Sequence, residues 1–305
     1  MKKIEFYAMG CQMSALVDAD SEAAVSHLVE VPAWFEEWER SLSRFRPESE
    51  LNQLNDRSGE SVTVSETLWE VLQLSLRVAH LSQGIVIPTL LGALEAAGYD
   101  RSFEILQPTL PGPSSLSDPF LSQAAWQEIH LDPYLRRVTL PPGVRLDLGG
   151  VAKGWAAHQA MLRLAAYGPA LVDASGDIAI SAGLWSVGVA DPFQPEEDLE
   201  LVWVRRNGVA TSGRDYRRWK KNGAWQHHLI DPRTALPAET DVLSATVIAP
   251  DVIEAEMAAK IALILGSQKG LEWLSSHPSL AGLLVLEDHH ILYTEHFSCY
   301  LKINQ

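Results

Sequence analysis

Residues 145–155 read Arg-Leu-Asp-Leu-Gly-Gly-Val-Ala-Lys-Gly-Trp. The stretch predicts a strand, a Gly-Gly turn, and a helix over about 151–166 that ends at Gly168. Glycines let backbone N–H groups approach a ligand closely, and a helix N-terminus favours an anion. Lys153 lies in the first helical turn, where the helix dipole disfavours a cation, so we expect a compensating partner. Two interpretations stay open: a phosphate site, or a surface lysine near Asp147.

Helical and strand patterns do not alternate strictly along the rest of the chain, which favours an α+β fold over a doubly wound parallel sheet. Helices are expected at 32–44 with Pro32 in the first turn, at 66–82 between an N-cap at Ser65 and Gly84, and at 89–97 and 252–265. Strands are expected at 3–9, 11–18, 136–140, 144–148, 170–174, 177–182, 184–190, 199–205, 225–230 and 242–249, with a final hairpin over 281–294. The Pro- and Ser-rich segment 107–123 predicts a long surface loop or a boundary between two lobes.

Composition limits the class of protein. The 305 residues include 24 Lys and Arg against 39 Asp and Glu, a net charge of −15, which argues against sequence-independent binding of nucleic acid. A hydrophobic fraction of 47% is that of a globular chain. Cys11 and Cys299 are too few for a disulfide scaffold. Without an apolar run of about 18 residues or a signal-like N-terminus, we expect a soluble cytoplasmic protein with reduced thiols and no membrane span.

Three later segments carry candidate chemistry. In 171–177 (Leu-Val-Asp-Ala-Ser-Gly-Asp), Asp173 and Asp177 suit a ribose or base edge, or form an ordinary Asp-containing turn. In 250–266, Glu256 and Lys260 share one helix face, as an exposed pair worth about 0.2–0.5 kcal/mol or as a partly buried pair. Segment 209–233 holds a basic cluster that fits an anion site, although WKKNG at 219–223 is typical of a solvated hairpin tip; its cations are Arg214, Arg217, Arg218, Lys220 and Lys221.

The ordered set of blocks resembles the ApbE family, the FAD:protein FMN transferases, over nearly the whole chain. The blocks are Met9-Gly10, Ser-Arg-Phe-Arg-Pro-Glu-Ser-Glu-Leu-Asn-Gln-Leu-Asn at 43–55, Ser82-Gln-Gly, Pro88-Thr89, Leu-Asp-Leu-Gly-Gly-Val-Ala-Lys-Gly, Asp-Ala-Ser-Gly-Asp, Ala-Thr-Ser-Gly, His-Leu-Ile-Asp-Pro-Arg-Thr and Thr-Val-Ile-Ala-Pro with a following Leu-Gly. The resemblance implies a single domain over 1–305, with an α+β fold of mixed β-sheets, flanking helices and an FAD cleft between two lobes.

The same resemblance implies an activity. Such proteins bind FAD and, with Mg²⁺, move its FMN part onto a Thr or Ser of a flavin-accepting target protein, releasing AMP; some relatives hydrolyse FAD instead. Carried over by position, the FAD contacts are Met9, Phe45, Asp147, Lys153 and the strand from His228 to Ile230, and Asp177 and Lys260 are further candidate contacts. Gly150, through its carbonyl, and Glu256 are the implied metal ligands. His228 is the candidate general base, and Asp231 either orients it or serves a structural turn. The chain contains no good acceptor segment, so self-flavinylation is not expected.

Several positions depart from the family pattern. The Asp and Thr that usually ligate Mg²⁺ on the late helix are Glu256 and Lys260 here, and a lysine ammonium cannot ligate a hard divalent ion. Two expectations follow: a metal-dependent transferase with a rearranged site, or an FAD-binding protein with weak, altered (FAD pyrophosphatase) or no transferase activity that binds without Mg²⁺. Other departures are Cys11 for Thr, Val86-Ile87 for Phe-Asp, His158 for an acid, and Asp173-Ala-Ser-Gly for Asn-Ala-Gly-Gly.

Overall fold

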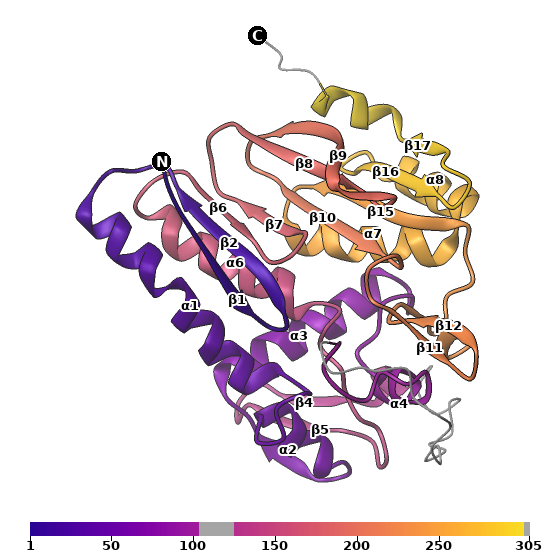
Figure 1. Ribbon diagram of the computed structural model, residues 1–305. Coiled ribbons are helices and arrows are strands. Elements are labelled where there is room, and N and C mark those ends of the chain that lie inside the picture. Colours follow the sequence, from indigo (N-terminus) through magenta and orange to yellow (C-terminus); the bar gives the residue numbers. More distant parts are fainter. Residues whose placement is uncertain (104–124, 302–305) are drawn as a thin grey trace. The chain divides into compact units, whose positions relative to one another are not determined.

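The computed structural model describes residues 1–103 and 125–301, and these fall into two compact units. The first unit comprises Met1–Phe35, Lys153–Tyr216 and Thr240–Gln305, and the second comprises Glu36–Ala152 and Arg217–Glu239. The predicted loop and lobe boundary at 107–123 lie outside the described residues. Helices accompany separate antiparallel sheets (Figure 1), so the α+β class expected from the sequence is confirmed.

An eight-stranded sheet forms the centre of the first unit, with the order β1-β2-β6-β7-β10-β15-β16-β17 and antiparallel pairing throughout. The strands are β1 (Lys2–Ala8), β2 (Cys11–Val17), β6 (Ala170–Asp173), β7 (Asp177–Ile180), β10 (Gly208–Gly213), β15 (Val242–Ala249), β16 (Ala281–Leu286) and β17 (Ile291–Tyr293). The central strands carry apolar residues on both faces, so both faces of the sheet are covered by other elements.

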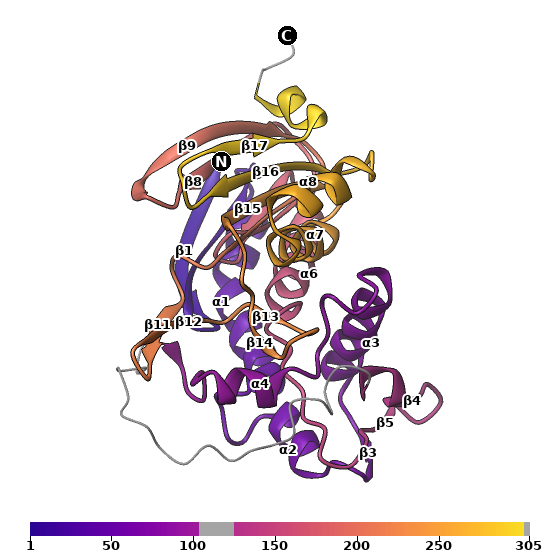
Figure 2. The same ribbon diagram turned by 90° about the vertical axis from the view of Figure 1, so that its right-hand side faces the viewer.

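Each face of this sheet has its own cover (Figure 2). The hairpin of β8 (Trp185–Asp191) and β9 (Gln194–Val204) packs Val187 and Val202 against sheet residues such as Ile178 and Ile248. The helices α6 (Ala152–Ala165) and α7 (Val252–Leu265) lie on the other face, where α7 contacts β10 and β15. Helix α8 (Ser267–Ser275) follows Gly266, and the short helix η4 (Glu295–Tyr300) ends the described chain.

Helix α1 corrects the predicted helix 32–44. It runs over Glu22–Leu42, so Pro32 lies inside the helix and not in its first turn. Proline removes one backbone hydrogen bond and crowds the carbonyl four residues earlier. Burial of one apolar stripe outweighs that cost, because the helix hides Leu28, Val31, Phe35, Trp38 and Leu42 at helical spacing.

The second unit is built from short elements. Its helices are α2 (Glu50–Asp56), α3 (Glu66–Leu81), α4 (Leu91–Ala96) and η3 (Trp126–Glu128). Its strands form the sheets β3-β5-β4 (Ser61–Thr63, Arg137–Thr139, His130–Asp132), β11-β12 (Arg218–Lys221, Ala224–His227) and β13-β14 (Ile230–Asp231, Leu236–Pro237). The predicted boundaries of α3 are confirmed: Ser65 Oγ accepts from the Leu68 N–H at 3.2 Å, and Gly84 follows the helix with a φ of 82°.

Two strand predictions in the second unit are wrong. Residues 144–148 form no strand, because the side chain of Asn55 supplies both hydrogen bonds of Leu146: Asn55 Nδ2 donates to its carbonyl at 3.0 Å, and Asn55 Oδ1 accepts from its N–H at 2.7 Å. Segment 225–230 is divided between β12 and β13. The hairpin tip at 219–223 is confirmed, since Asn222 and Gly223 have φ values of 52° and 81°, as a two-residue turn between twisted strands requires.

Two further expectations concern the thiols and the membrane. Both cysteines are free, with Cys11 buried and Cys299 exposed. Across residues 1–103 and 125–301, none of the helices has the length and apolar character needed to cross a bilayer.

Candidate functional site

Four charged side chains of the first unit form what we call the lysine–carboxylate cluster: Lys153, Asp177, Glu256 and Lys260. Lys153 Nζ donates to Asp177 Oδ2, and Lys260 Nζ donates to Glu256 Oε1 at 2.8 Å. The side chains of Asp177 and Glu256 are 3% and 2% exposed, against 18% and 14% for Lys153 and Lys260. Asp177 is therefore the compensating partner expected for Lys153, and Lys153 is not an exposed surface lysine. The Glu256–Lys260 pair is the partly buried one.

The elements explain why these charges meet. Lys153 lies in the first turn of α6, Asp177 opens β7, and the other two lie one turn apart on α7. Helix α7 is apolar or small at nearly every other position and is buried on most sides, so its charged pair lies largely out of water, with Lys260 14% exposed. Its N-cap is Asp251, whose Oδ1 accepts from the Glu254 N–H at 2.8 Å.

Gly154 permits the close approach of α6 to α7. A Cβ atom at this position would overlap Glu256 Oε2 and crowd the rest of that carboxylate. Glu256 thus has Lys260 on one oxygen and the Gly154 backbone against the other. The Gly-Gly-Val-Ala-Lys-Gly stretch therefore needs its last glycine for helix packing.

Burial and mutual charge set the ionisation of the cluster. Burial raises the pKa of Glu256 to about 7, Asp177 acts in the same direction, and Lys260 and Lys153 oppose both. Burial lowers the pKa of Lys153, but the charges of Asp177 and Glu256 outweigh it and leave that pKa above its usual value. With all four groups charged the cluster is neutral, and removing any member leaves an unpaired buried charge, which typically costs about 3–5 kcal/mol.

Asp173 belongs to the same neighbourhood. Burial raises its pKa, the Gly176 N–H opposes this through a 2.8 Å hydrogen bond to Asp173 Oδ1, and the charge of Asp177 raises it further. This bond is an Asx turn within segment 171–177, so for Asp173 the simple turn interpretation is the one that the structure supports.

The residues at Glu256 do not fit the divalent metal ion that the family implies. One carboxylate oxygen accepts from an ammonium, and the other faces Gly154. No group of three or more His, Cys, Asp and Glu side chains is placed to hold a metal within the described ranges 1–103 and 125–301. Gly150, the other implied ligand, belongs to the second unit. It lies in a turn that is closed by a hydrogen bond from the Val151 N–H to the Leu148 carbonyl.

A second candidate group lies entirely in the second unit, around Arg44. Its Nε is 2.6 Å from Asp147 Oδ2, and its guanidinium carbon lies 4.1 Å from the Phe45 ring centre and 4.5 Å from that of Tyr99. Its side chain is 5% exposed, and its buried Nη2 has no hydrogen-bond partner among the described residues. The family resemblance singled out Asp147 and Phe45 but missed Arg44, which holds both.

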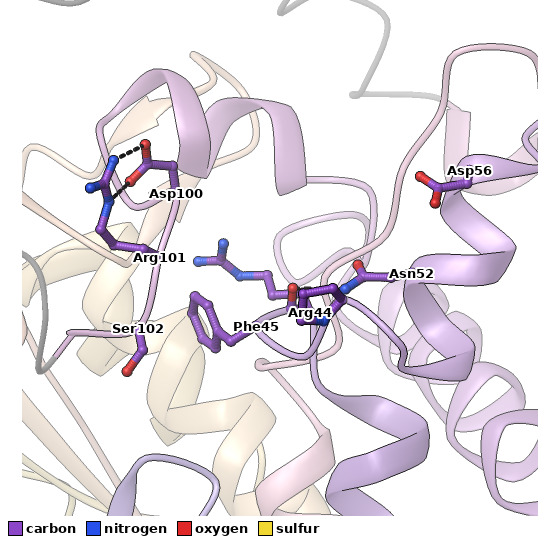
Figure 3. A pocket seen from close by; sticks show the side chains of 8 residues that line it. Arg44, Phe45, Asn52, Asp56, Asp100, Arg101 and Ser102 are labelled. Atoms are coloured by element: carbon purple, nitrogen blue, oxygen red, sulfur yellow. Dashed lines mark hydrogen bonds and ion pairs between the residues drawn. The ribbon is translucent and has the colours of Figure 1, made fainter.

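A pocket of about 430 Å³ opens beside this group (Figure 3). Arg44, Phe45 and Asn52 line it on one side, and Asp100, Arg101 and Ser102 on another. Arg101 pairs with Asp100 at 2.8 and 2.9 Å, so the lining combines an aromatic ring with polar groups, a composition that suits a planar heteroaromatic ligand.

The remaining predicted site residues are Asp231, His228, Ile230 and Met9. Asp231 accepts hydrogen bonds from Arg233, at 2.8 and 3.1 Å from Nε and at 2.7 Å from Nη2, which supports the structural turn. His228 is half-buried between β12 and β13, and Ile230 is buried. Met9 lies in the β1–β2 turn with a φ of 50°.

The basic segment 214–221 does not gather into one anion site. Arg214 bonds to the carbonyls of Val242 and Thr240 and pairs with Glu287 at 2.6 Å. Lys221 donates to the Ala96 carbonyl, and Arg218 and Lys220 each lie 5.0 Å from the Trp225 ring centre. These four cations are therefore held by their own surroundings.

Taken together, the antiparallel sheets, the helix pair on one face of the large sheet and the paired charges define an α+β protein with a largely buried cluster of two lysines and two carboxylates. The sequence model of the ApbE family matches residues 9–284, and the chain belongs to that family. It is 32% identical to the FAD:protein FMN transferase of Treponema pallidum, over 87% of this chain and 78% of that protein. It is 25% identical to the Klebsiella pneumoniae protein of the same name, over 93% and 89%.

Solved structures agree on the fold. The ApbE protein of Thermotoga maritima superposes with a TM-score of 0.86 at 25% identity, covering 99% of each chain. The flavinyl transferase ApbE of Pseudomonas stutzeri, in its apo form, gives 0.80 at 20% identity over 100% of this chain and 98% of that one. The ApbE-like fold expected from the sequence is confirmed.

Proposed function

We propose that this protein is an FAD-binding transferase that moves FMN from FAD onto a Thr or Ser hydroxyl of a target protein and releases AMP. The proposal rests on Lys153, a partly buried, charged lysine in the first turn of α6, in a chain whose relatives are named FAD:protein FMN transferases. Phosphoryl transfer needs positive charge around the diphosphate more than it needs covalent help from the protein.

A direct transfer forms one phosphorus–oxygen bond and breaks another. The target hydroxyl oxygen forms a bond to the phosphorus on the FMN side of the diphosphate, and the bond from that phosphorus to the bridging oxygen breaks. AMP leaves with the bridging oxygen, and the hydroxyl proton passes to a base. His228 is the proposed base, since a neutral imidazole suits this role near pH 7.

The other proposed FAD contacts follow residue type. Lys153 and Lys260 would neutralise phosphate oxygens, with Asp177 holding Lys153 in place. Considered by itself, the pocket beside Phe45 would accept a planar ring, and Asp147 would act there through Arg44. Met9 and Ile230 would supply apolar contacts.

A second candidate function is FAD binding with hydrolysis to FMN and AMP, or without chemistry. The Glu256–Lys260 pair favours it, because the usual metal ligands are replaced by an ion pair that is already satisfied. In hydrolysis a water oxygen would take the place of the hydroxyl oxygen, with the same leaving group.

One assay separates these functions. Purified protein is incubated with FAD and a target carrying an acceptor sequence of the type Asp-Gly-Ala/Ser-Thr/Ser-Thr, with and without Mg²⁺. A fluorescent target band after denaturing electrophoresis, together with AMP, supports transfer. AMP without the band supports hydrolysis, and bound FAD without AMP supports a binding protein. Absence of FAD binding under all conditions refutes the proposal.

A Lys153→Met variant tests the role proposed for Lys153 in FAD binding. It is expected to weaken FAD binding by about tenfold or more, the loss typical of one charge-assisted hydrogen bond. Lys269→Met, on the exposed side of α8, is the matched control, and it is expected to bind FAD as the unmodified protein does.

A further inference from the structure

The lysine–carboxylate cluster also suggests which cation neutralises a diphosphate bound at this site. We propose that the Lys260 ammonium takes the place of a divalent metal ion, so that this protein binds the diphosphate of FAD without Mg²⁺. The inference rests on the proposed FAD-binding function and specifies the cation that this function uses.

The Glu256 carboxylate is already engaged by its neighbours. Glu256 Oε1 accepts from Lys260 Nζ at 2.8 Å, and Oε2 faces the Gly154 backbone, where there is no room even for a methyl group. Mg²⁺ prefers six oxygen ligands in an octahedron at about 2.0–2.1 Å. To reach Glu256 the ion would have to displace the Lys260 ammonium, which cannot ligate it.

The carboxylates and the lysines of the cluster differ in their exposure to solvent. The carboxylates of Asp177 and Glu256 are almost fully buried, whereas the side chains of Lys153 and Lys260 retain 18% and 14% exposure. The cations are thus the more accessible members of the cluster, and the acids are the more buried ones. An anion arriving from solvent would be attracted by the ammonium groups, which would repel a divalent cation.

Both lysine ammonium groups have hydrogen-bond donors beyond those used within the cluster. An ammonium carries three N–H donors, and each lysine uses one of them on its carboxylate partner. Two donors on each lysine stay available for phosphate oxygens while the ion pairs persist. The cluster therefore binds an anion without first breaking the contacts that stabilise it.

Equilibrium binding gives the direct test. The full-length protein is freed of flavin and metals, and its affinity for FAD is measured by quenching of flavin fluorescence, in excess EDTA and in Mg²⁺. We expect the two dissociation constants to agree within about threefold, below one tenfold step in affinity. Mn²⁺ alone, followed by electron paramagnetic resonance, is expected not to bind the unmodified protein.

Variants of Lys260 assign the effect to this side chain. Lys260→Thr is expected to weaken FAD binding in EDTA by about 10- to 100-fold, and to regain affinity when Mg²⁺ is added, because Glu256 and the new hydroxyl then offer oxygen ligands. Lys260→Met should lose the same affinity with no recovery in Mg²⁺. Lys269→Thr, at an exposed position of α8, is the control, and thermal unfolding of each variant shows that it is folded.

The outcomes are distinct. If FAD binding by the unmodified protein vanishes in EDTA and returns with Mg²⁺, the metal-replacement inference is overturned while the proposed function stands. The inference is also overturned if Lys260→Met binds FAD in EDTA as tightly as the unmodified protein. If FAD binds under neither condition, both the proposed function and this inference are refuted.

Discussion

Replacing Gly154 by alanine tests whether the approach of α6 to α7 depends on a missing side chain. The added Cβ would overlap Glu256 Oε2, on a carboxylate that is 2% exposed and tied to Lys260 at 2.8 Å. The carboxylate cannot swing into solvent, so either the helices separate or the ion pair is disturbed.

The magnitude follows from opposing effects. Overpacking a well-packed interior costs about 1–3 kcal/mol, and fully breaking a buried ion pair costs about 3–5 kcal/mol. Alanine returns up to about 1 kcal/mol through its better helix propensity, and less in a first turn. We expect Gly154→Ala to lower the free energy of unfolding by about 2–4 kcal/mol.

The control is the same substitution in a Glu256→Ala background. There the methyl group meets no carboxylate, so Gly154→Ala should be neutral or slightly stabilising, and the double-mutant cycle should show coupling of about 2 kcal/mol or more. Urea denaturation of the ligand-free proteins, followed by tryptophan fluorescence and by circular dichroism, measures all four free energies. An unchanged stability in Gly154→Ala alone would show that the packing argument is wrong.

Three further predictions concern the second unit. Asn55→Ala should destabilise it by about 2–3 kcal/mol, because the buried N–H and carbonyl of Leu146 lose both partners; urea denaturation measures this, and a loss below about 0.5 kcal/mol contradicts it. Ser65→Ala should cost about 1 kcal/mol in the same assay through loss of the α3 N-cap, with an unchanged midpoint as the contrary result. The hydrogen bond from Arg46 lowers the pKa of Glu36 to about 2, so this pair stabilises the fold above pH 4.5 and the contribution is lost as pH falls toward 2. The carboxylate is 43% exposed, so Arg46→Met should remove only a shallow acid slope of less than about 1 kcal/mol, and an identical pH profile would refute the assignment.

Local sequence signals predicted much of the fold because they act over short distances. Ser65 caps its helix, and Asn222-Gly223 turns a hairpin, each through atoms a few residues away. The missed elements depend on distant partners. Leu146 looks like part of a strand, but Asn55, 91 residues away, takes its backbone hydrogen bonds. Pro32 looked like a helix start, and only burial of the stripe from Leu28 to Leu42 shows that the helix begins ten residues earlier.

The candidate site shows the same division between local and distant information. The sequence predicted that Lys153 needs a partner, since a cation in a first helical turn is unfavourable whatever the fold. It did not say that the partner is Asp177, because that depends on where β7 lies beside α6. Arg44 was missed for a related reason: nothing near it in sequence shows that Asp147 and Tyr99 enclose it.

The environment of Glu256 and Lys260 was, by contrast, within reach of the sequence. Spacing alone leaves the pair exposed or buried, but the helix around it is apolar or small at nearly every other position, with Ala255, Ala259 and Ile261 beside the charges. A helix apolar all round is buried, and buried charges must be paired. Two opposite charges four residues apart on such a helix therefore have to meet each other. A pair that satisfies itself in this way leaves a divalent ion little to gain, and this ties the metal question to the burial of α7.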